Sequence, residues 1–172
     1  MISKCLVGRI IQCHIDHSDP ESFVVGRVAY TDSNWFIMQD LSPSGHWNGL
    51  ALYMQADVVS VKKFTDYIHR VVSLANYRNE LEPFVPSMSR DPLMSLLLYA
   101  RDSNRIIGIE LHASGYRDVN GSIDSLTENT LCVNQFDEFG RADGKSYLSI
   151  DAITRCYLGD EESTCLEILR NT

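Results

Sequence analysis

The sequence lacks the motifs by which most enzymes are recognised. It contains no Gly-x-Ser-x-Gly nucleophile turn, no Gly-x-x-x-x-Gly-Lys phosphate loop and no His-Glu-x-x-His zinc motif. Acidic pairs occur at Asp137-Glu138 and Glu161-Glu162, but adjacent carboxylates in a loop or at a helix start are usually solvated. We therefore predict that the protein is not an enzyme, with no catalytic residue, no metal and no cofactor.

Cysteine is too irregularly spaced for a disulfide framework or a zinc finger. There are five cysteines, an odd number, and no Cys-x-x-Cys pair. We interpret all five as reduced thiols, which predicts a cytoplasmic protein. Lys4 and Arg9 interrupt the apolar residues of the N-terminus, so it does not resemble a signal peptide, and no apolar run approaches the length of a membrane span.

Clusters of metal ligands are also scarce, and the one dense group is Cys13-His14-Ile15-Asp16-His17. On a strand, Cys13 and His17 would face one side, while His14 and Asp16 would face the other. Neither face offers three ligands, so a zinc site would need partners from elsewhere in the chain. We predict an ordinary strand here.

Positive charge is in deficit. The chain has 15 Lys and Arg residues against 23 Asp and Glu residues, which gives a net charge of -8. An acidic surface repels phosphate backbones and anionic membranes. The charge therefore favours a protein partner, disfavours RNA and predicts no membrane association.

What the sequence does contain is an internal repeat, the first feature to seek when a fold is predicted. A shift of 95 residues places the stretch Gly26–Val61 on Gly121–Cys156. A shift of 96 residues aligns Arg9-Ile10-Ile11 with Arg105-Ile106-Ile107. The identical matches after the first shift are Gly26 with Gly121, Asn34 with Asn129, Gly45 with Gly140 and Gly49 with Gly144. These matches predict a tandem duplication.

Each copy of the repeat resembles a series of short strands. The stretches 24–30 and 35–41 alternate apolar and polar residues, and Gly, Pro and Asn-Gly punctuate the chain between them. About five short antiparallel strands would fit a small closed barrel, which removes exposed sheet edges. We predict a mainly β fold with helices, in which residues 1–63 and 104–158 form two tandem five-stranded barrels.

The remaining residues show helical patterns. We predict a helical linker over 64–103, with helices near 64–79 and 92–102, and a C-terminal helix in 159–172. Apolar residues recur at about 3.6-residue spacing in the first helix, and Pro92 suits the first turn of the second. We expect the first helix to pack on its own barrel rather than offer a groove to a partner.

The second half carries a familiar order of motifs: a helix at Pro92–Ala100, the strand Asn120–Leu126, then Leu131 and Val133, and a closing Asp151-Ala152-Ile153-Thr154. This order resembles the Sm-like barrels, particularly the bacterial Hfq type and other small bacterial SH3-like barrel proteins. The resemblance implies a small barrel and, in the Sm-like family, RNA binding through basic or Arg-Gly residues of the closing-strand motif. Here the matching positions are Ala56-Asp57 and Ile150-Asp151, so the resemblance implies a fold and no activity.

Four residues are candidates for recognition because loops carry function and tryptophan is enriched in binding hot spots. They are Trp35, His46, Trp47 and Arg141. The alternative for Trp47 is that it folds back to close the core. Copy two has Thr130 and Ala142 at the tryptophan positions, so a tryptophan-based site would belong to copy one.

These patterns predict a non-catalytic binding or assembly module that contacts another protein, and the alternative is an Sm-like RNA-binding protein. A basic stripe near a barrel mouth would favour RNA, and a uniformly acidic surface would favour protein. We also predict a monomer or homodimer rather than a ring of six or seven chains. Two copies share one chain, and Lys62-Lys63 would discourage pairing at the edge of the first copy.

Overall fold

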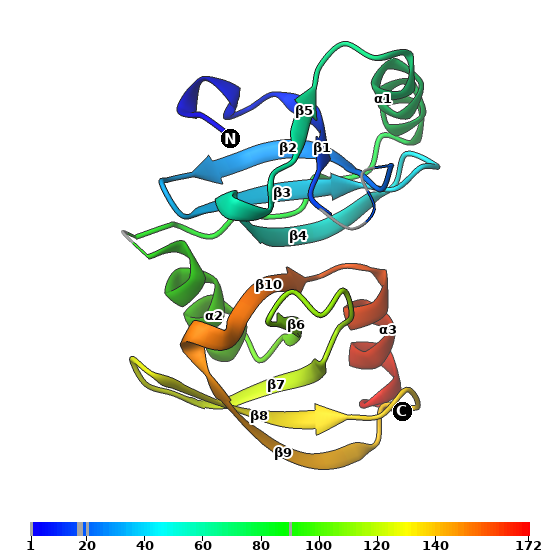
Figure 1. Ribbon diagram of the computed structural model, residues 1–172. Helices are drawn as coiled ribbons and strands as arrows, with labels where there is room; N and C mark the ends of the chain where they lie inside the picture. The colour runs from blue at the N-terminus through cyan, green and yellow to red at the C-terminus, as the bar shows by residue number, and fades with distance from the viewer. Residues whose placement is uncertain (1, 17–18, 20, 90) are drawn as a thin grey trace. The chain divides into compact units, whose positions relative to one another are not determined.

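The computed structural model describes residues 2–16, 19, 21–89 and 91–172. The chain divides into two compact units, Met1–Val85 and Pro86–Thr172, here called unit 1 and unit 2. Figure 1 shows the helices and strands of both units. The division falls in a segment with two prolines, Pro83 and Pro86, in which residues 80–89 form no helix or strand.

The described residues of unit 1 form five strands, two short 3-10 helices and one α-helix. In chain order these are η1 (Lys4–Leu6), β1 (Ile10–His14), β2 (Val24–Thr31), β3 (Trp35–Leu41), β4 (Trp47–Met54), η2 (Gln55–Asp57), β5 (Ser60–Lys62) and α1 (Asp66–Arg78). Thr65 caps α1, because its side-chain oxygen accepts a hydrogen bond from the Ile68 N–H at 3.1 Å. Asn79 ends the helix in the left-handed conformation.

Unit 2 has the same series of strands with an additional helix in front. Its elements are α2 (Pro92–Asp102), β6 (Ile106–Leu111), β7 (Val119–Leu126), β8 (Thr130–Phe136), β9 (Ala142–Ser149), η3 (Ile150–Ala152), β10 (Ile153–Leu158) and α3 (Glu161–Leu169). Asp91 caps α2 by accepting a hydrogen bond from the Met94 N–H at 3.0 Å, and Pro92 occupies the first turn as predicted.

The prediction of two closed five-stranded barrels is wrong, because the ten strands form open antiparallel sheet. The order is β5-β1-β2-β3-β4 in unit 1 and β10-β6-β7-β8-β9 in unit 2. In the described residues, β5 does not pair with β4, and β10 does not pair with β9. Apolar alternation predicts where strands lie, but closure depends on strand tilt and stagger, which alternation does not encode.

The prediction of a helical linker is also wrong, because each helix belongs to one unit. Ile68 and Val71 of α1 lie in a buried cluster with Val25 of β2 and Leu41 of β3. In unit 2, α2 contacts β7 and α3 contacts β6. A helix with an apolar stripe is stabilised by burying that stripe against a neighbouring sheet, so α1 and α2 pack within their units.

The spacing of 95 residues recurs in the packing of the two units. Gly45 and Gly140 have φ values of 81° and 75°, which favour glycine, and each lies in the turn between the third and fourth strands of its unit. A Cβ atom on Gly45 would collide with Leu74 of α1, and one on Gly140 would collide with Leu169 of α3. Leu74 and Leu169 are again 95 residues apart, so α1 and α3 occupy equivalent positions.

The α-helices labelled in Figure 1 are short, with 13 residues in α1, 11 in α2 and 9 in α3. Among the described residues, none forms a helix long and apolar enough to cross a membrane.

Candidate binding pocket in unit 1

The two tryptophans predicted to take part in recognition lie far apart on the β3–β4 hairpin. Trp35 pairs with Met54 at one end of the hairpin, and Trp47 pairs with Leu41 at the other. The two side chains therefore cannot belong to one compact site.

Trp47 packs inward. Its half-buried ring lies against the core cluster of unit 1, and the Arg27 guanidinium lies 5.7 Å from the ring centroid. This is the arrangement expected of a tryptophan that closes the core. A role for Trp47 in recognition stays a prediction.

His46 and Arg141 lie in the equivalent turns of unit 1 and unit 2. His46 Nδ1 is 2.6 Å from Glu80 Oε1, so this side chain is engaged within its own unit. The Arg141 N–H donates to Asp137 Oδ1 at 2.8 Å, and its guanidinium lies 5.2 Å from the centroid of the Phe139 ring. The structure does not gather the four predicted residues into one site.

Unit 1 instead contains a pocket of about 570 Å³ between β1 and α1. Its apolar lining comes mainly from Leu6 of η1, Ile10 of β1, and Ile68 and Val72 of α1. A volume of this size lies in the range of about 300–1,000 Å³ that is typical of ligand sites. The pocket can therefore hold one or two apolar side chains of a partner or a small apolar molecule.

Basic side chains surround this apolar lining. Arg9, Arg27, Lys63 and His69 all line the pocket. Arg27 forms an ion pair with Glu82 at 2.8 Å, yet its Nε atom is buried without a hydrogen-bond partner. Arg9 and Lys63 are exposed, and the structure assigns them no ion pair among the described residues. The rim thus offers positive charge that the chain does not neutralise.

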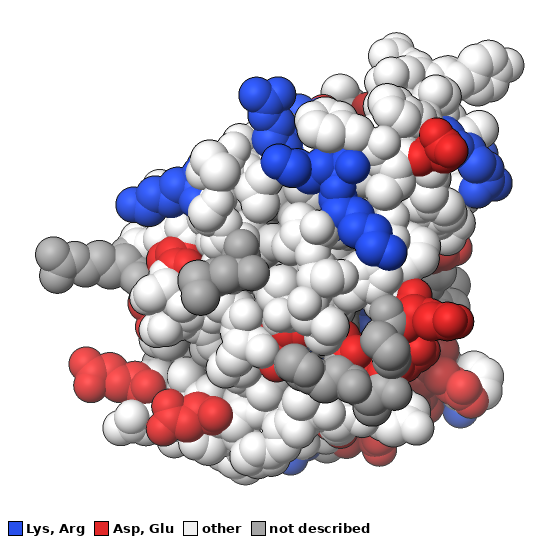
Figure 2. Space-filling view, turned by 45° about the horizontal axis from the view of Figure 1, so that its top comes forward, with Lys and Arg blue, Asp and Glu red and all other residues white. Residues whose placement is uncertain are grey.

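The basic rim contrasts with the charge of the whole chain. Figure 2 shows Lys and Arg side chains gathered on the surface of unit 1. Unit 1 has seven Lys and Arg against nine Asp and Glu, a net charge of -2, whereas unit 2 has eight against fourteen, a net charge of -6. The acidity that disfavours anionic partners therefore belongs mainly to unit 2.

Phe64 stands at the edge of the pocket with 81% of its surface exposed. Its φ is 57°, a left-handed conformation that is unusual for a bulky residue. The Lys63 ammonium lies 5.9 Å from the centroid of its ring. The backbone therefore holds an apolar ring in solvent beside a cation, which is a suitable contact surface for a partner.

Unit 2 has a different arrangement at the equivalent position. The pairing of Ile10 with Arg27 in unit 1 matches that of Ile106 with Ser122 in unit 2, so Arg9 corresponds to Arg105. Val72 of α1 corresponds to Glu167 of α3 by the 95-residue spacing. Arg105 Nε donates to Glu167 Oε1 at 2.7 Å, and the Ile106 N–H donates to the same oxygen at 2.9 Å. An internal carboxylate thus occupies this position in unit 2.

A smaller pocket of about 350 Å³ in unit 2 has the opposite charge. Asp137, Glu138 and Glu162 line it together with apolar residues that include Leu166 and Leu169. No Lys or Arg contributes to its described lining. The pockets of the two units therefore differ in the sign of the charged side chains that line them.

The buried thiols of the chain are unsuited to nucleophilic chemistry. Burial raises the pKa of Cys13 to about 12, and it also raises the pKa of Cys156. Among the described residues, no group of three His, Cys, Asp or Glu side chains could hold a metal ion. His17, part of the dense group of possible ligands, lies outside the described residues.

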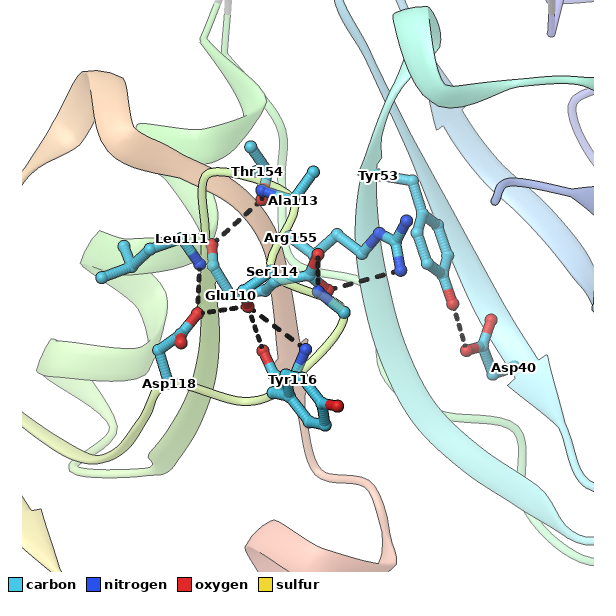
Figure 3. A network of polar contacts seen from close by, with 11 residues as sticks. Asp40, Tyr53, Glu110, Leu111, Ala113, Ser114, Tyr116, Asp118, Thr154 and Arg155 are labelled. Carbon is cyan, nitrogen blue, oxygen red and sulfur yellow. Dashed lines mark hydrogen bonds and ion pairs between the residues drawn. The ribbon is translucent and has the colours of Figure 1, made fainter. Parts of the chain in front are cut away.

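A polar network in unit 2 stabilises the loop that follows β6 (Figure 3). Glu110, only 1% exposed, forms an ion pair with Arg155 at 3.3 Å and accepts a hydrogen bond from the Gly115 N–H at 3.1 Å. Asp118 accepts hydrogen bonds from the Leu111 N–H and the Ser114 hydroxyl, both at 2.7 Å. These contacts account for the order of the loop, so the network is a structural feature.

The sequence contained a signal for the unit 1 pocket that motif reasoning did not use. The shift of 96 residues had already aligned Arg9 with Arg105. Extending the 95-residue shift into the helices aligns Val72 with Glu167. The comparison shows that both copies have the arginine, but that only the second copy has a carboxylate to pair with it. The tryptophan content of the sequence points instead to Trp35 and Trp47, which do not line this pocket.

No family model, no curated protein and no solved structure matches this chain. The resemblance to Sm-like proteins therefore stays a prediction.

Proposed function

We propose that the protein is a non-catalytic binding module that holds a segment of another protein in the unit 1 pocket. One observation carries this proposal. The pocket with its apolar lining and basic rim is open in unit 1, whereas the Arg105–Glu167 ion pair occupies the equivalent position in unit 2.

The chemistry of the pocket suits a protein segment. Burial of one large aliphatic side chain against Leu6, Ile68 and Val72 would contribute about 1.5–3 kcal/mol. Phe64 extends the apolar surface beyond the pocket, so a segment longer than one residue would gain further contact. Arg9 and Lys63 would favour acidic segments over basic ones and would accelerate association.

The repeat supports a division of roles within this proposal. We infer that the two units descend from a tandem duplication, because the matched glycines and helix contacts keep the same 95-residue spacing. Unit 1 would then retain the binding site, and unit 2 would serve as a scaffold. Free cysteines, three of them buried, support a cytoplasmic location.

RNA binding is the second candidate, and the rim of the pocket is the observation that favours it. Single-stranded nucleic acids bind where cations follow the backbone and aromatic rings stack on bases. Arg9, Lys63 and the exposed ring of Phe64 could supply both contacts. The apolar lining behind them favours the protein segment, because phosphates gain nothing from it.

A photo-crosslinking experiment in the source cell tests the proposal. A photoreactive phenylalanine analogue would replace Phe64, and a matched control would carry it at Tyr147, an aromatic residue of unit 2 that is 74% exposed. We expect a defined protein adduct from position 64 that survives nuclease, is lost with Arg9→Glu and is absent from position 147. Adducts that disappear with nuclease would support RNA instead, and equal labelling at both positions would contradict the proposal.

A further inference from the structure

Unit 2 shows how this fold holds a carboxylate at the junction of its sheet and helix. Glu167 of α3 receives one hydrogen bond from the Arg105 side chain and one from the Ile106 N–H. Arg105 immediately precedes β6, and Ile106 begins it. The Ile106 N–H faces away from β7 and towards Glu167. The arrangement is a charge-assisted hydrogen bond supported by a backbone donor.

Unit 1 has both donors without the carboxylate. Ile10 faces Arg27 across β1 and β2, and the Val28 N–H donates to the Arg9 carbonyl at 3.0 Å. In an antiparallel pair this pattern places the Ile10 N–H on the side away from β2. On that side β5 ends at Lys62, opposite Gln12. The described chain assigns the Ile10 N–H no acceptor.

The helix explains the missing acceptor. Val72 occupies the position in α1 that Glu167 occupies in α3, and it is a lining residue of the pocket. An apolar side chain at this position offers no acceptor to the guanidinium of Arg9 or to the N–H of Ile10. Ile10 is half-buried, and a half-buried N–H without a partner is unfavourable, so an external acceptor would supply the missing hydrogen bond.

We infer that the unit 1 pocket binds a Glu or Asp side chain of the partner segment, with Arg9 and the Ile10 N–H as its donors. This inference rests on the proposed protein-binding function and names the chemistry of the partner. The carboxylate takes the place that Glu167 takes in unit 2. An apolar neighbour of that residue in the partner enters the lining formed by Leu6, Ile68 and Val72.

The rim and the pocket together favour a protein carboxylate over other anions. A phosphate backbone carries many charges, whereas the rim offers two exposed cations without an ion pair in the described residues, Arg9 and Lys63, beside an apolar surface. Arg27 is already paired with Glu82 at 2.8 Å, so it adds little free charge. The exposed ring of Phe64 extends the apolar surface beyond the pocket, which suits a chain segment better than an isolated small acid.

The test uses peptides selected from a displayed library of random dodecapeptides on the full-length protein. Occupancy is read as slower alkylation of Cys5, an exposed thiol that lines the pocket, with exposed Cys165 of unit 2 as the internal control. Affinity of a synthetic selected peptide is measured by fluorescence anisotropy. The same peptide with Gln in place of its Glu or Asp tests the carboxylate directly.

Four variants separate charge from shape. Val72→Glu supplies the internal carboxylate seen in unit 2, so it should pair with Arg9 and weaken peptide binding by about tenfold or more. Val72→Gln fills a similar space without the charge; because it replaces part of the apolar lining it should weaken binding by about threefold, clearly less than Val72→Glu. Arg9→Met should weaken binding about tenfold, whereas Arg70→Met, an equal loss of charge outside the pocket, should leave it unchanged.

Each result either supports or overturns the inference. Acidic and apolar peptides with the expected variant pattern support it. If the Gln peptide binds as well, or Val72→Gln is as harmful as Val72→Glu, the carboxylate assignment falls while protein binding stands. If no selected peptide protects Cys5, but a uridine-rich RNA oligonucleotide does, the proposed function falls too. If octanoate protects Cys5 from alkylation and no peptide does, the carboxylate belongs to a small acid, and the inference that a protein supplies it is wrong.

Discussion

Unit 1 and unit 2 share a strand order but stabilise their last helix by different chemistry. In unit 1, apolar contacts dominate: Ile68 and Val71 of α1 are buried against β2 and β3. In unit 2, Leu166 of α3 is buried as well, but ion pairs also hold this helix: Glu167 binds Arg105, and Asp160 at the start of α3 binds Arg117. The same arrangement of strands and helix therefore tolerates either kind of contact. Only in unit 2 does the helix place a carboxylate, that of Glu167, next to the first strand.

The beginning of the helix shows the contrast most clearly. Thr65 and Asp160 are equivalent, 95 residues apart, and each precedes its helix. Thr65 caps the free N–H of Ile68, which is an ordinary helix start. Asp160 makes no cap and instead forms an ion pair with Arg117, whose guanidinium lies 4.4 Å from the centroid of the Tyr157 ring. The acidic unit thus uses buried charge where the other unit uses a cap.

The largest expected effect is the loss of that buried charge. Asp160 is only 4% exposed in its side chain, so Asp160→Ala leaves Arg117 without its main partner and should lower the free energy of unfolding by about 3–5 kcal/mol. Thr65→Ala removes the cap and a 3.3 Å hydrogen bond from the Thr65 hydroxyl to Gln12 Oε1, and it should cost about 1 kcal/mol. Urea unfolding would compare the two. Equal costs would show that the units do not differ in this way.

One buried thiol in each unit allows the unfolding of unit 1 and of unit 2 to be measured separately. Cys13 of unit 1 and Cys156 of unit 2 are both fully buried, so each reacts with an alkylating reagent only when its own unit opens. Both tryptophans also lie in unit 1, which gives that unit a fluorescence signal of its own. Asp160→Ala should accelerate labelling of Cys156 more than labelling of Cys13.

The second prediction concerns a feature that the two units share. Gly45→Ala and Gly140→Ala place a Cβ atom against the adjacent helix at a positive φ, so each should destabilise its unit by about 2–4 kcal/mol. Gly144→Ala is the matched control. Its φ is 82° but nothing lies within 4 Å of the added Cβ, so it should cost only about 1 kcal/mol. A harmless Gly140→Ala would indicate that α3 does not rest on the turn.

The outcome for the fold shows what a sequence pattern can and cannot predict. The helices near 64–79 and 92–102 were placed well, at Asp66–Arg78 and Pro92–Asp102, because caps and apolar spacing are local signals. The turn glycines Gly45 and Gly140 were found for the same reason. Closure of a barrel was predicted wrongly, because it depends on how strands twist and stagger over the whole sheet.

The candidate pocket was missed for a physical reason of a different kind. Its lining combines residues from both ends of unit 1, such as Arg9 and Val72, and no local motif connects them. Phe64 is conspicuous only once its backbone conformation and its 81% exposure are seen. The repeat could still have supplied the site, since a residue that differs between two copies at an otherwise matched position indicates a changed role.

The third prediction tests the ion pair that fills the pocket position in unit 2. Glu167 is mostly buried and bonds both to Arg105 and to the Ile106 N–H, so Glu167→Gln should lower the free energy of unfolding by about 1–2 kcal/mol. Val72→Gln at the equivalent position of unit 1 breaks no hydrogen bond and should cost less than about 1 kcal/mol. Thermal unfolding monitored by circular dichroism would measure both. A larger cost for Val72→Gln would mean that the pocket is closed by packing in solution.

The smallest expected effect is alkaline destabilisation, which both units should show alike. Burial raises the folded-state pKa of Cys13 to about 12, and it raises that of Cys156 as well, from an ordinary value of 9.0. Because the unfolded thiol ionises first, the stabilising contribution is complete below pH 9 and is lost as the pH rises from 9 towards the folded pKa. At pH 10 each thiol should cost about 1 kcal/mol relative to pH 8. Cys13→Ala and Cys156→Ala should each remove one such contribution from the pH profile of urea unfolding, and a profile unchanged by either substitution would contradict the assigned burial of that thiol.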